Sequence, residues 1–584
     1  MDKASGVYLT LTDKSFLNGG TSVMKYVIPM LTVKGELGLN RVTATNLEEV
    51  VGYDIKYNSN YYGLRQLLEN LTYVDVWRLN QNAKLANGYF TSASGSASTN
   101  ANATSFEDVT TISNVLLAVA SLTPGLTGRP CVKFAPQVES KIIANEASSQ
   151  TITIPNCNIT TTMSLGTTSG CLAGAVFYDS TGTNIVGVIT KSSSTYTPKK
   201  VIDGVVQNTN IGTASLSGTT LTINLTGDFS DDYAWNLQTF STNPIDWILY
   251  VGQYNATTGT YSTSKSYSFS MDSESDNYWK NILFGDVQIY IKDNTNPISV
   301  EKARDWFELQ SGSNGDTTVS PSLIDVTQLD LCDANIMLMN GMGSDNAAIV
   351  NRMVPKCEKK KIHMFVDAPA ESKYENVLIW ANSIQRSEYV AIGARPDQFV
   401  TPENKTAFVY PSVNYGLIFA RMYKTYGNLN YPPAGPSYGM IGATDLIQCD
   451  YNMYGDELKT NRINWQTSNN LGTMMWEQRT TYGLNSDLSY IAPVFIIDSL
   501  SEDMVNFERN FNFRYMSADD LSNQQSGLNT ILKNFVDDGF LYWYELKVPS
   551  FAEAQAAGRT LVIQVQVRVS KDSEVINIDL VLNN

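Results

Sequence analysis

Two hydrophobic periods alternate near the start of the chain, one typical of strands and the other of helices. The apolar run MKYVIPML (24–31) predicts a buried strand, and YVDVWRLN (73–80) predicts another. Between them, Tyr61 and the leucines that follow it lie on one stripe of a predicted helix, and TNLE, from Thr45 to Glu48, has the pattern of a capping box that opens a shorter helix. Strand, helix and strand in this order predict the first part of an α/β layer.

Helix and strand patterns alternate again after residue 325. The segments ANIMLMN, IHMFVDAP and YVAIGA are predicted to be buried strands. Helices are predicted over 345–357, around 374–384 and over 415–426. This order predicts a three-layer core in which helices cover both faces of a sheet.

The segment between these two parts, from residue 86 to residue 325, is rich in Ser, Thr, Asn and Gly. Short alternating runs such as QTITIPNCNITT, TLTINLTGD and DVQIYIKD are separated by turn residues. This texture predicts an inserted all-β region built as sandwiches or small barrels.

The last part of the chain combines helices with regularly alternating strands. Helices are predicted over 504–511 and 528–536, and LVIQVQVRV (561–569) predicts a strand. In the closing segment VINIDLVLNN, one face of a strand would carry the four aliphatic residues Ile576, Ile578, Leu580 and Leu582. The pattern leaves open whether this strand forms a hairpin with 561–569, pairs elsewhere in its own subunit or pairs with another molecule.

A comparable extended arm begins the chain. In GVYLTLTDKSF, Val7, Leu9 and Leu11 lie on one face beside Tyr8, and two glycines separate the arm from the first buried strand. Together the patterns predict a multidomain α/β and α+β core with an inserted all-β region and extended N- and C-terminal strand arms. The predicted segments are an N-terminal arm (1–25), a first core part (26–85), a surface-facing insertion (86–325), a second core part (326–440), a C-terminal domain (441–570) and a C-terminal arm (571–584).

Composition and charge exclude several classes of protein. A chain of 584 residues is long enough for about two to four domains. Its formal net charge of -16 disfavours nucleic-acid binding, because phosphate contacts need clusters of Lys and Arg. No segment approaches the roughly 18 continuous apolar residues of a membrane helix, and MDKASGVYLT lacks the features of a secretory signal. We therefore expect assembly in a cytoplasm.

Candidate catalytic groups are few. None of the six cysteines forms a CxxC pair, so buried free thiols are expected rather than a zinc site. The single histidine, His363, lies in a predicted buried strand and is expected to pack rather than to catalyse. GPSYG (435–439) matches the G-x-S-x-G pattern, but its Pro-rich and Gly-rich surroundings lack the strand and helix of a nucleophile elbow, and His363 precedes Ser437, so a loop is expected.

Motifs for metals and nucleotides are also incomplete. Asp330 and Asp333 lack the spacing of a calcium loop, and GMGSDNA (341–347) lacks a phosphate-binding pattern and is expected to cap a helix. Paired carboxylates for sugar cleavage are not excluded, but no stretch points to them. The sequence therefore predicts no enzyme, no cofactor and no metal site.

Several segments resemble, in the same order, motifs of the contractile tail sheath proteins of bacteriophages and related injection machines. SGVY, ending at Tyr8, stands where the family has Pro-Gly-Val-Tyr, and residues 26–85 resemble its first strand and helix block. SYSFSMDSESDNYWKNILFG, ending at Gly285, and PSVNYGLIFARMYKTYGNLNYPPAG (411–435) resemble two later segments. WEQRT (476–480) is similar to the family's Trp-Gly-Gln-Arg-Thr element. The resemblance covers about 26–85 and 265–584.

This resemblance implies the subunit of a contractile tail sheath, located in the virion after assembly in the host cytoplasm. Such subunits form hexameric rings stacked helically around a tail tube, contact baseplate and tail terminator proteins, and contract to drive the tube through the host envelope for genome delivery. It implies no direct binding of nucleic acid and no insertion into a membrane. It also implies that terminal arms add strands to the sheet of a neighbour's C-terminal domain. The residues assigned to these arms are Val7, Tyr8, Leu9, Leu11, Ile576, Ile578, Leu580 and Leu582.

Two other functions fit parts of the sequence. A virion-surface adhesion protein would use the β-rich region to bind glycans, but this function does not explain the α/β core. A hydrolase with scattered carboxylates would have a pH-dependent activity that is lost on single Asp or Glu changes.

Overall fold

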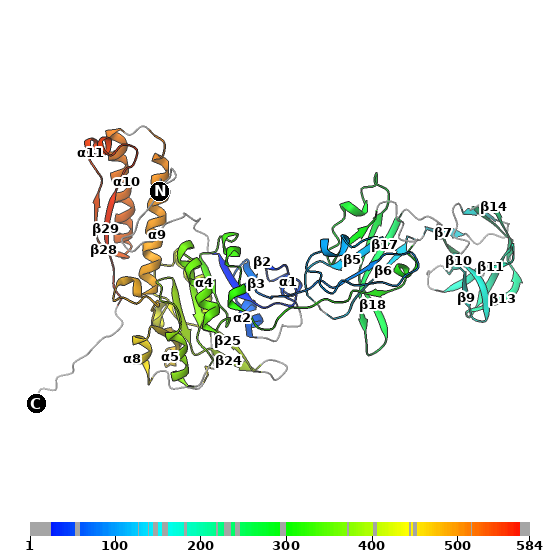
Figure 1. Ribbon diagram of the computed structural model, residues 1–584, viewed down its shortest axis with the longest axis horizontal. Helices are drawn as coiled ribbons and strands as arrows, with labels where there is room; N and C mark the ends of the chain where they lie inside the picture. The colour runs from blue at the N-terminus through cyan, green and yellow to red at the C-terminus, as the bar shows by residue number, and fades with distance from the viewer. Residues whose placement is uncertain are drawn as a thin grey trace, which may run out of the picture. The chain divides into compact units, whose positions relative to one another are not determined.

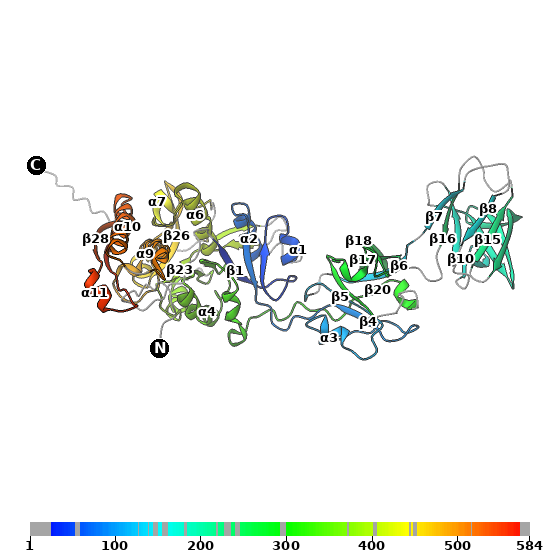
Figure 2. The ribbon, with the colours of Figure 1, turned by 90° about the horizontal axis from the view of Figure 1, so that it is seen from above.

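The chain forms two compact units, one made of Met1–Asn82 with Asn314–Asn584 and the other of Ala83–Ser313. The computed structural model (Figures 1 and 2) describes residues 25–52, 59–125, 128–137, 139–143, 150–154, 162–179, 184–217, 220–226, 235–239, 246–292, 300–370, 373–400, 406–442, 446–447, 453–514 and 517–572. All eight residues assigned to the terminal arms lie outside these ranges.

An eight-stranded sheet forms the centre of the first unit. Its order is β2-β3-β1-β21-β22-β23-β26-β27, and the inner strands are parallel, whereas β2 and β27 are antiparallel edges. The inner strands YVIPM, HMFVD and VAIGA are buried at every position, as expected for parallel strands covered on both faces. The strands are β1 (Tyr26–Met30), β2 (Gly38–Val42), β3 (Val74–Arg78), β21 (Ile336–Leu338), β22 (His363–Asp367), β23 (Val390–Ala394), β26 (Ile463–Asn469) and β27 (Gly472–Trp476).

Helices cover both faces of this sheet. One hydrophobic core lies against α4 (Ala347–Lys360) and α5 (Tyr374–Asn382), and the other against α1 (Leu47–Val51), α2 (Ser59–Leu68) and α6 (Pro411–Tyr426). Successive strand residues point to opposite faces, so Met337 belongs to the first core and Leu338 to the second. These contacts confirm the predicted three-layer α/β core. Because β26 and β27 belong to the sheet, this core continues past residue 440, where the sequence predicted its second part to end.

A buried aspartate connects β22 to helix α6. Asp367 Oδ1 accepts a hydrogen bond from Ser412 N at 2.8 Å, and its Oδ2 accepts from Gly341 N at 2.8 Å and from Ser412 Oγ at 2.7 Å. Asp367 therefore satisfies an N–H group in the first turn of α6, which the helix itself leaves without a partner. Burial raises the pKa of Asp367 to about 6.

Local capping agrees with the sequence at α4 and differs from it at α1. Asn346 Oδ1 accepts from Ala348 N at 3.1 Å, which confirms that GMGSDNA caps α4. At α1 the N-cap residue is Asn46, and its side chain accepts from Thr43 N at 2.7 Å instead of from the helix. The predicted capping box at 45–48 is therefore wrong: no side chain caps this helix, and the hydroxyl of Thr45 lies 3.0 Å from that of Thr43 instead.

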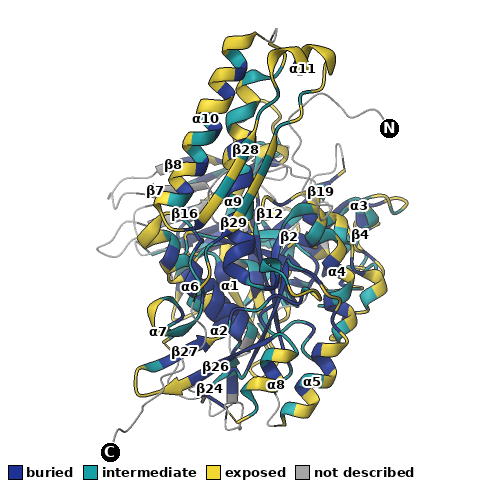
Figure 3. Ribbon diagram, turned by 90° about the vertical axis from the view of Figure 1, so that its left-hand side faces the viewer, coloured by how far each residue is buried: buried dark blue, intermediate teal, exposed yellow. Residues whose placement is uncertain are grey.

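The C-terminal part of the first unit is a helix pair that carries a small sheet. α9 (Ile491–Glu508) packs against α10 (Ala518–Asp537), and β28 (Leu541–Lys547) pairs antiparallel with β29 (Gln564–Val569) (Figure 3). Ser517 and Asp520 form a capping box at the start of α10. The remaining short elements of this unit are β24 (Asp397–Val400), β25 (Thr406–Val409), α7 (Gly435–Tyr438), α8 (Gly455–Thr460) and α11 (Phe551–Ala556).

The second unit is built mainly of antiparallel strands. A four-stranded sheet, β18-β17-β6-β20, shares one hydrophobic core with a three-stranded sheet, β19-β5-β4. Trp247 and Leu249 of the first sheet and Leu117 of the second lie in this core. The elements are β4 (Asn87–Phe90), α3 (Glu107–Thr110), β5 (Leu117–Ser121), β6 (Pro130–Pro136), β17 (Asp246–Asn255), β18 (Thr260–Ser270), β19 (Val287–Ile291) and β20 (Phe307–Glu308).

The middle of the second unit's sequence, from β7 to β16, forms a ten-stranded sheet with a core of its own. Its main path is β7-β16-β10-β11-β12-β14-β15-β8, with β9 beside β10 and β13 beside β12. Phe177 and Leu221 are fully buried in this core. The strands are β7 (Glu139–Ile143), β8 (Gln150–Ile154), β9 (Thr162–Leu165), β10 (Thr168–Tyr178), β11 (Ile185–Ser192), β12 (Thr195–Ile202), β13 (Val205–Asn210), β14 (Gly212–Ser217), β15 (Thr220–Leu225) and β16 (Trp235–Thr239).

Four of the six cysteines lie within the described residues. Cys131, Cys171, Cys332 and Cys357 are all free and buried, which confirms this part of the sequence prediction. Cys157 and Cys449 lie outside the described residues.

The separate cores predict that the two units lose stability independently. Leu338→Ala, at a fully buried position of β21, should lower the free energy of unfolding of the first unit by about 2 to 5 kcal/mol, because it leaves a cavity between sheet and helices. Urea denaturation followed by segment-resolved hydrogen exchange measures each unit, and the protection of the second unit should not change. The control is Leu323→Ala, at a position that is 64% exposed, which should have an effect below about 0.5 kcal/mol. Equal loss of protection in both units would contradict independent cores.

Candidate functional site

The small sheet of β28 and β29 has open edges. Its register runs from Leu541 opposite Val569 to Lys547 opposite Gln564. Within the described ranges, neither strand pairs with a third one. The outer edge of such a strand presents N–H and C=O groups to which another strand can bind. This pair of edges is the candidate assembly site of the chain.

One face of the sheet is covered by its own subunit. Apolar side chains from both strands pack against α9 and α10 in a single core, namely Leu541, Tyr544, Leu546, Val565, Val567 and Val569. The other face is exposed and carries Glu545, Lys547, Gln564, Gln566 and Arg568. Its aromatic residue, Trp543, lies beneath the Arg568 guanidinium, whose carbon is 5.1 Å from the ring centroid. The backbone N–H and C=O groups along the two edges, rather than the side chains of the faces, therefore remain available for hydrogen bonds.

Helix α9 belongs to two hydrophobic cores. Ile491 and Phe495 pack against the central sheet, whereas Leu500 and Met504 pack in the C-terminal core beneath β28 and β29. Because protein interiors are closely packed, a helix shared in this way holds the two cores in a fixed relation. A force applied to the small sheet would therefore reach the central sheet through α9.

A buried ionic cluster fixes α9 at its midpoint. Asp498 Oδ1 accepts from Lys361 Nζ at 2.7 Å and from the Tyr389 hydroxyl at 3.2 Å, and Asp498 Oδ2 lies 3.0 Å from His363 Nε2. Lys361 is the C-cap residue of α4 and His363 begins β22, so the cluster joins the end of α4, the central sheet and α9. Burial raises the pKa of the Asp498 carboxyl, but the hydrogen bonds and charges of His363 and Lys361 outweigh this effect and lower the pKa below its usual range.

The root of the C-terminal segment is also fixed. Asp572, the last described residue, accepts a hydrogen bond through Oδ2 from Gln478 Nε2 at 2.8 Å. Gln478 is 2% exposed, and its Oε1 accepts from Ala492 N in the first turn of α9 at 3.1 Å. Asp572 is therefore held beside the beginning of α9.

The two candidate catalytic residues, His363 and Ser437, have different surroundings. His363 stacks on Phe495, with ring centroids 3.8 Å apart, and pairs with Asp498, which confirms the expected packing role. Ser437 is exposed on the one-turn helix α7 rather than in the predicted loop. The segment before α7 has no strand within the described residues, so the geometry of a nucleophile elbow is missing there.

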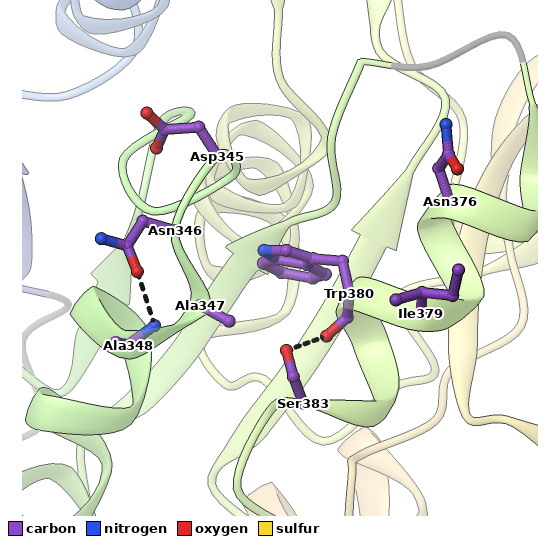
Figure 4. Close-up of a pocket in the computed structure, with 8 residues that line it drawn as sticks. All are labelled: Asp345, Asn346, Ala347, Ala348, Asn376, Ile379, Trp380 and Ser383. Carbon is purple, nitrogen blue, oxygen red and sulfur yellow. Dashed lines mark hydrogen bonds between the residues drawn. The ribbon is translucent and has the colours of Figure 1, made fainter.

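An open groove of about 450 Å³ lies between the start of α4 and the side of α5 that runs from Asn376 to Ser383, just past the end of the helix (Figure 4). Trp380 Nε1 donates to Gly343 O at 3.1 Å, and the Ser383 hydroxyl donates to Trp380 O at 2.5 Å. The Asn346 side chain caps α4. These groups are used within the fold, and the groove offers no convergent set of polar groups for a ligand.

The described part of the chain has neither a cluster of metal ligands nor a helix that could span a membrane. No group of three or more His, Cys, Asp or Glu side chains there is placed to hold a metal ion. Among the helices described, none combines the length and the apolar character needed to cross a membrane.

The sequence predicts the arms but not the β28–β29 sheet. The arm residues lie outside the described residues, so the structure does not test them. The strand LYWYELK (541–547) was not singled out, although its aromatic content, between Gly539 and Pro549, is a signal for a strand.

The chain is similar to solved structures of tail sheath proteins. The sheath tail protein of Desulfitobacterium hafniense is 11% identical, with a TM-score of 0.44 and 93% of each chain covered. The sheath tail protein of Listeria innocua is 11% identical, with a TM-score of 0.41 and coverage of 91% of this chain and 87% of the other. The contracted helical sheath of the anti-feeding prophage is 16% identical, with a TM-score of 0.37 and coverage of 45% and 74%.

These proteins are tail sheath proteins, the family that the sequence motifs resemble. No protein-family model matches the chain, and no curated protein matches it. At such identities and TM-scores the likeness carries no argument about function, which has to come from the chain's own residues.

The ionic cluster predicts a specific acid sensitivity. Asp498→Asn should lower the free energy of unfolding at pH 7 by about 3 kcal/mol, because it leaves Lys361 buried without a counter-charge. Since folding lowers the pKa of Asp498, its contribution is present above the ordinary pKa of an aspartate and is lost as the pH falls through the folded-state pKa. The wild type should therefore lose stability more steeply on acidification than the variant.

Urea denaturation at a series of pH values measures this difference. The matched control is Asp503→Asn on the same helix, where burial raises the pKa of the carboxyl, so this substitution should not lower the stability at pH 7 and should steepen rather than flatten the acid profile. Identical acid profiles for the wild type and Asp498→Asn would contradict a stabilising role for the cluster.

Proposed function

We propose that this chain is the structural subunit of a contractile tail sheath. The observation that carries the proposal is the open-edged β28–β29 sheet, which is held by α9 on the α/β core. The order of sequence motifs over about 26–85 and 265–584 supports it independently.

In this function the arms of one subunit extend the small sheet of its neighbours. The aliphatic residues of the C-terminal arm, Ile576, Ile578, Leu580 and Leu582, would lie on the face of the enlarged sheet that packs on helices. The aliphatic residues of the N-terminal arm, Val7, Leu9 and Leu11 beside Tyr8, would also lie on the face that packs on helices. Backbone hydrogen bonds supply the strength of such strand addition, and alternate side chains set its register. Burying four aliphatic side chains contributes about 6 to 12 kcal/mol before the cost of ordering the arm.

Linked in this way, subunits form hexameric rings stacked helically around a tail tube. The sheath contacts baseplate and tail terminator proteins at its ends, and its shortening drives the tube through the host envelope for genome delivery from a virion. The work of contraction comes from the free-energy difference between two packings of the same subunits. Because α9 joins the receiving sheet to the central sheet, subunits can rotate as rigid bodies while their arms remain bound.

The second unit would face outward from this assembly. Its chain leaves and re-enters the first unit at neighbouring residues, since Asn80 Nδ2 donates to Asn314 O and Asp316 N donates to Gln81 O, both at 2.8 Å. A segment inserted between adjacent points can be large without altering the fold that holds it.

Truncation after Ser573 should abolish polymerisation and leave a folded, soluble subunit, because the donated strand is removed while both cores stay intact. Ile578→Lys and Leu580→Lys should act similarly, since each places a charge on the face meant for burial. Asp579→Lys, on the opposite face, is the matched control and should assemble nearly as the wild type does. Electron microscopy measures tube formation, and thermal unfolding of the monomer measures the fold.

Two results would contradict this assignment of the C-terminal arm. Unfolding of the truncated monomer would show that the closing strand belongs to its own subunit. Stable tubes of truncated protein would show that other elements link the subunits.

Deletion of Ala83–Ser313, with a short Gly-Ser linker between Asn82 and Asn314, should leave a core that still forms tubes. The reason is that the deleted unit has its own cores and the two chain ends are already side by side. Electron microscopy tests assembly, and circular dichroism tests the fold of the shortened chain. If several linker lengths give folded protein but no tubes, the second unit carries contacts of the lattice.

A further inference from the structure

One surface of the second unit has a composition unlike the rest of the fold. It lies on the sheet β18-β17-β6-β20 (Figure 2) and consists of four aromatic residues beside three charged ones. We call it the aromatic surface, and its members are Tyr250, Tyr254, Tyr261, Trp306, Arg129, Lys133 and Glu308.

The rings of this surface are held in a fixed arrangement. Tyr261 lies opposite Tyr254 in the β17–β18 pairing, with ring centroids 4.9 Å apart. Tyr261 is also parallel to Trp306, at 5.6 Å and an interplanar angle of 5°. Such offset stacking leaves part of each ring free, and Tyr261 remains 40% exposed.

A glycine allows the indole of Trp306 to lie against the sheet. A Cβ atom at Gly252 would be 3.1 Å from Trp306 Cη2 and 2.0 Å from Ser262 O, so any larger residue would push the ring outward. The pairing of β17 and β18 is irregular between Val251 and Gly252. The backbone is therefore adapted to hold Trp306 flat on the strands.

Charged groups border the rings on two sides. Arg129 Nε and Nη2 donate to the two carboxylate oxygens of Glu308 at 2.9 and 2.8 Å, and the guanidinium carbon lies 4.3 Å from the Tyr254 ring centroid. Lys133 Nζ lies 4.9 Å from the Tyr250 ring and 5.2 Å from the Trp306 ring. Within the described residues no carboxylate forms an ion pair with Lys133. A ligand here meets flat aromatic rings, a fixed donor–acceptor pair and one cation without an anionic partner.

We propose that the aromatic surface binds a saccharide that carries a carboxylate. The C–H face of a pyranose ring packs on exposed aromatic rings, and its hydroxyls need both donors and acceptors, which the Arg129–Glu308 pair provides. The ammonium of Lys133 matches the single carboxylate of an acidic sugar. A nucleic acid also stacks on aromatic rings, but it needs a basic groove, and here Glu308 and a chain charge of -16 oppose a polyanion.

Binding to an array of immobilised saccharides tests this proposal on the full-length chain. The array pairs uronic and sialic acids with their neutral counterparts, and a single-stranded DNA oligonucleotide serves as a competitor. The wild type should bind acidic saccharides, and Tyr261→Ala and Trp306→Ala should each weaken binding at least about ten-fold, since a stacking contact is lost. Lys133→Gln should reduce binding of acidic saccharides to the level of their neutral counterparts.

Two controls separate binding from folding and from exposed apolar surface in general. Tyr261→Phe keeps the ring and should bind nearly as the wild type does, whereas Leu283→Ala, at a position 95% exposed in the same unit, should have no effect. Because Trp306 packs on the sheet, the folding of Trp306→Ala is first checked by its melting temperature. If that variant unfolds, the comparison of Tyr261→Ala with Tyr261→Phe decides the test. Absence of saccharide binding by the wild type, equal binding by all variants, or displacement by the oligonucleotide would overturn the proposal.

Discussion

A strand edge without a partner is the constraint on which this account of the chain depends. Backbone N–H and C=O groups along an edge remain available for pairing, and natural proteins cover or charge such edges unless they use them. In the described part of the chain, β28 and β29 have only each other, and their apolar face packs against α9 and α10 with Leu541 and Val569 buried and the other apolar residues partly buried. One face of the sheet therefore packs on helices, whereas its two edges have no further strand. This geometry suits strand addition between subunits.

The position of this sheet explains how assembly could do mechanical work. Helix α9 is packed into the second core of the central sheet at Phe495 and into the C-terminal core at Leu500, with the buried cluster around Asp498 between them. Gln478 fixes both the start of α9 and the root of the closing segment. A force on a bound arm would thus be transmitted through α9 to the central sheet, and each subunit would rotate as a rigid body.

Local periodicity predicted the α/β core because parallel strands such as YVIPM and VAIGA are apolar at every position and the helices between them carry regular stripes. It could not reveal that β26 and β27 join the same sheet, since pairing between distant segments leaves no local signal. The capping box at 45–48 failed because the N-cap is Asn46 and the hydroxyl of Thr45 pairs with that of Thr43 instead. The sequence did not predict the β28–β29 sheet for a related reason, because only tertiary packing shows that LYWYELK and QVQVRV share a face and leave their edges open.

The most direct test of the central claim is an electron cryomicroscopy reconstruction of the assembled protein at a resolution that traces strands. The account predicts tubes in which the β28–β29 sheet gains at least one strand, and in which side-chain density identifies that strand as residues 575–582 or 7–11 of another subunit. A sheet that stays two-stranded in the tubes, or that is extended by residues 575–582 of its own chain, would contradict the account.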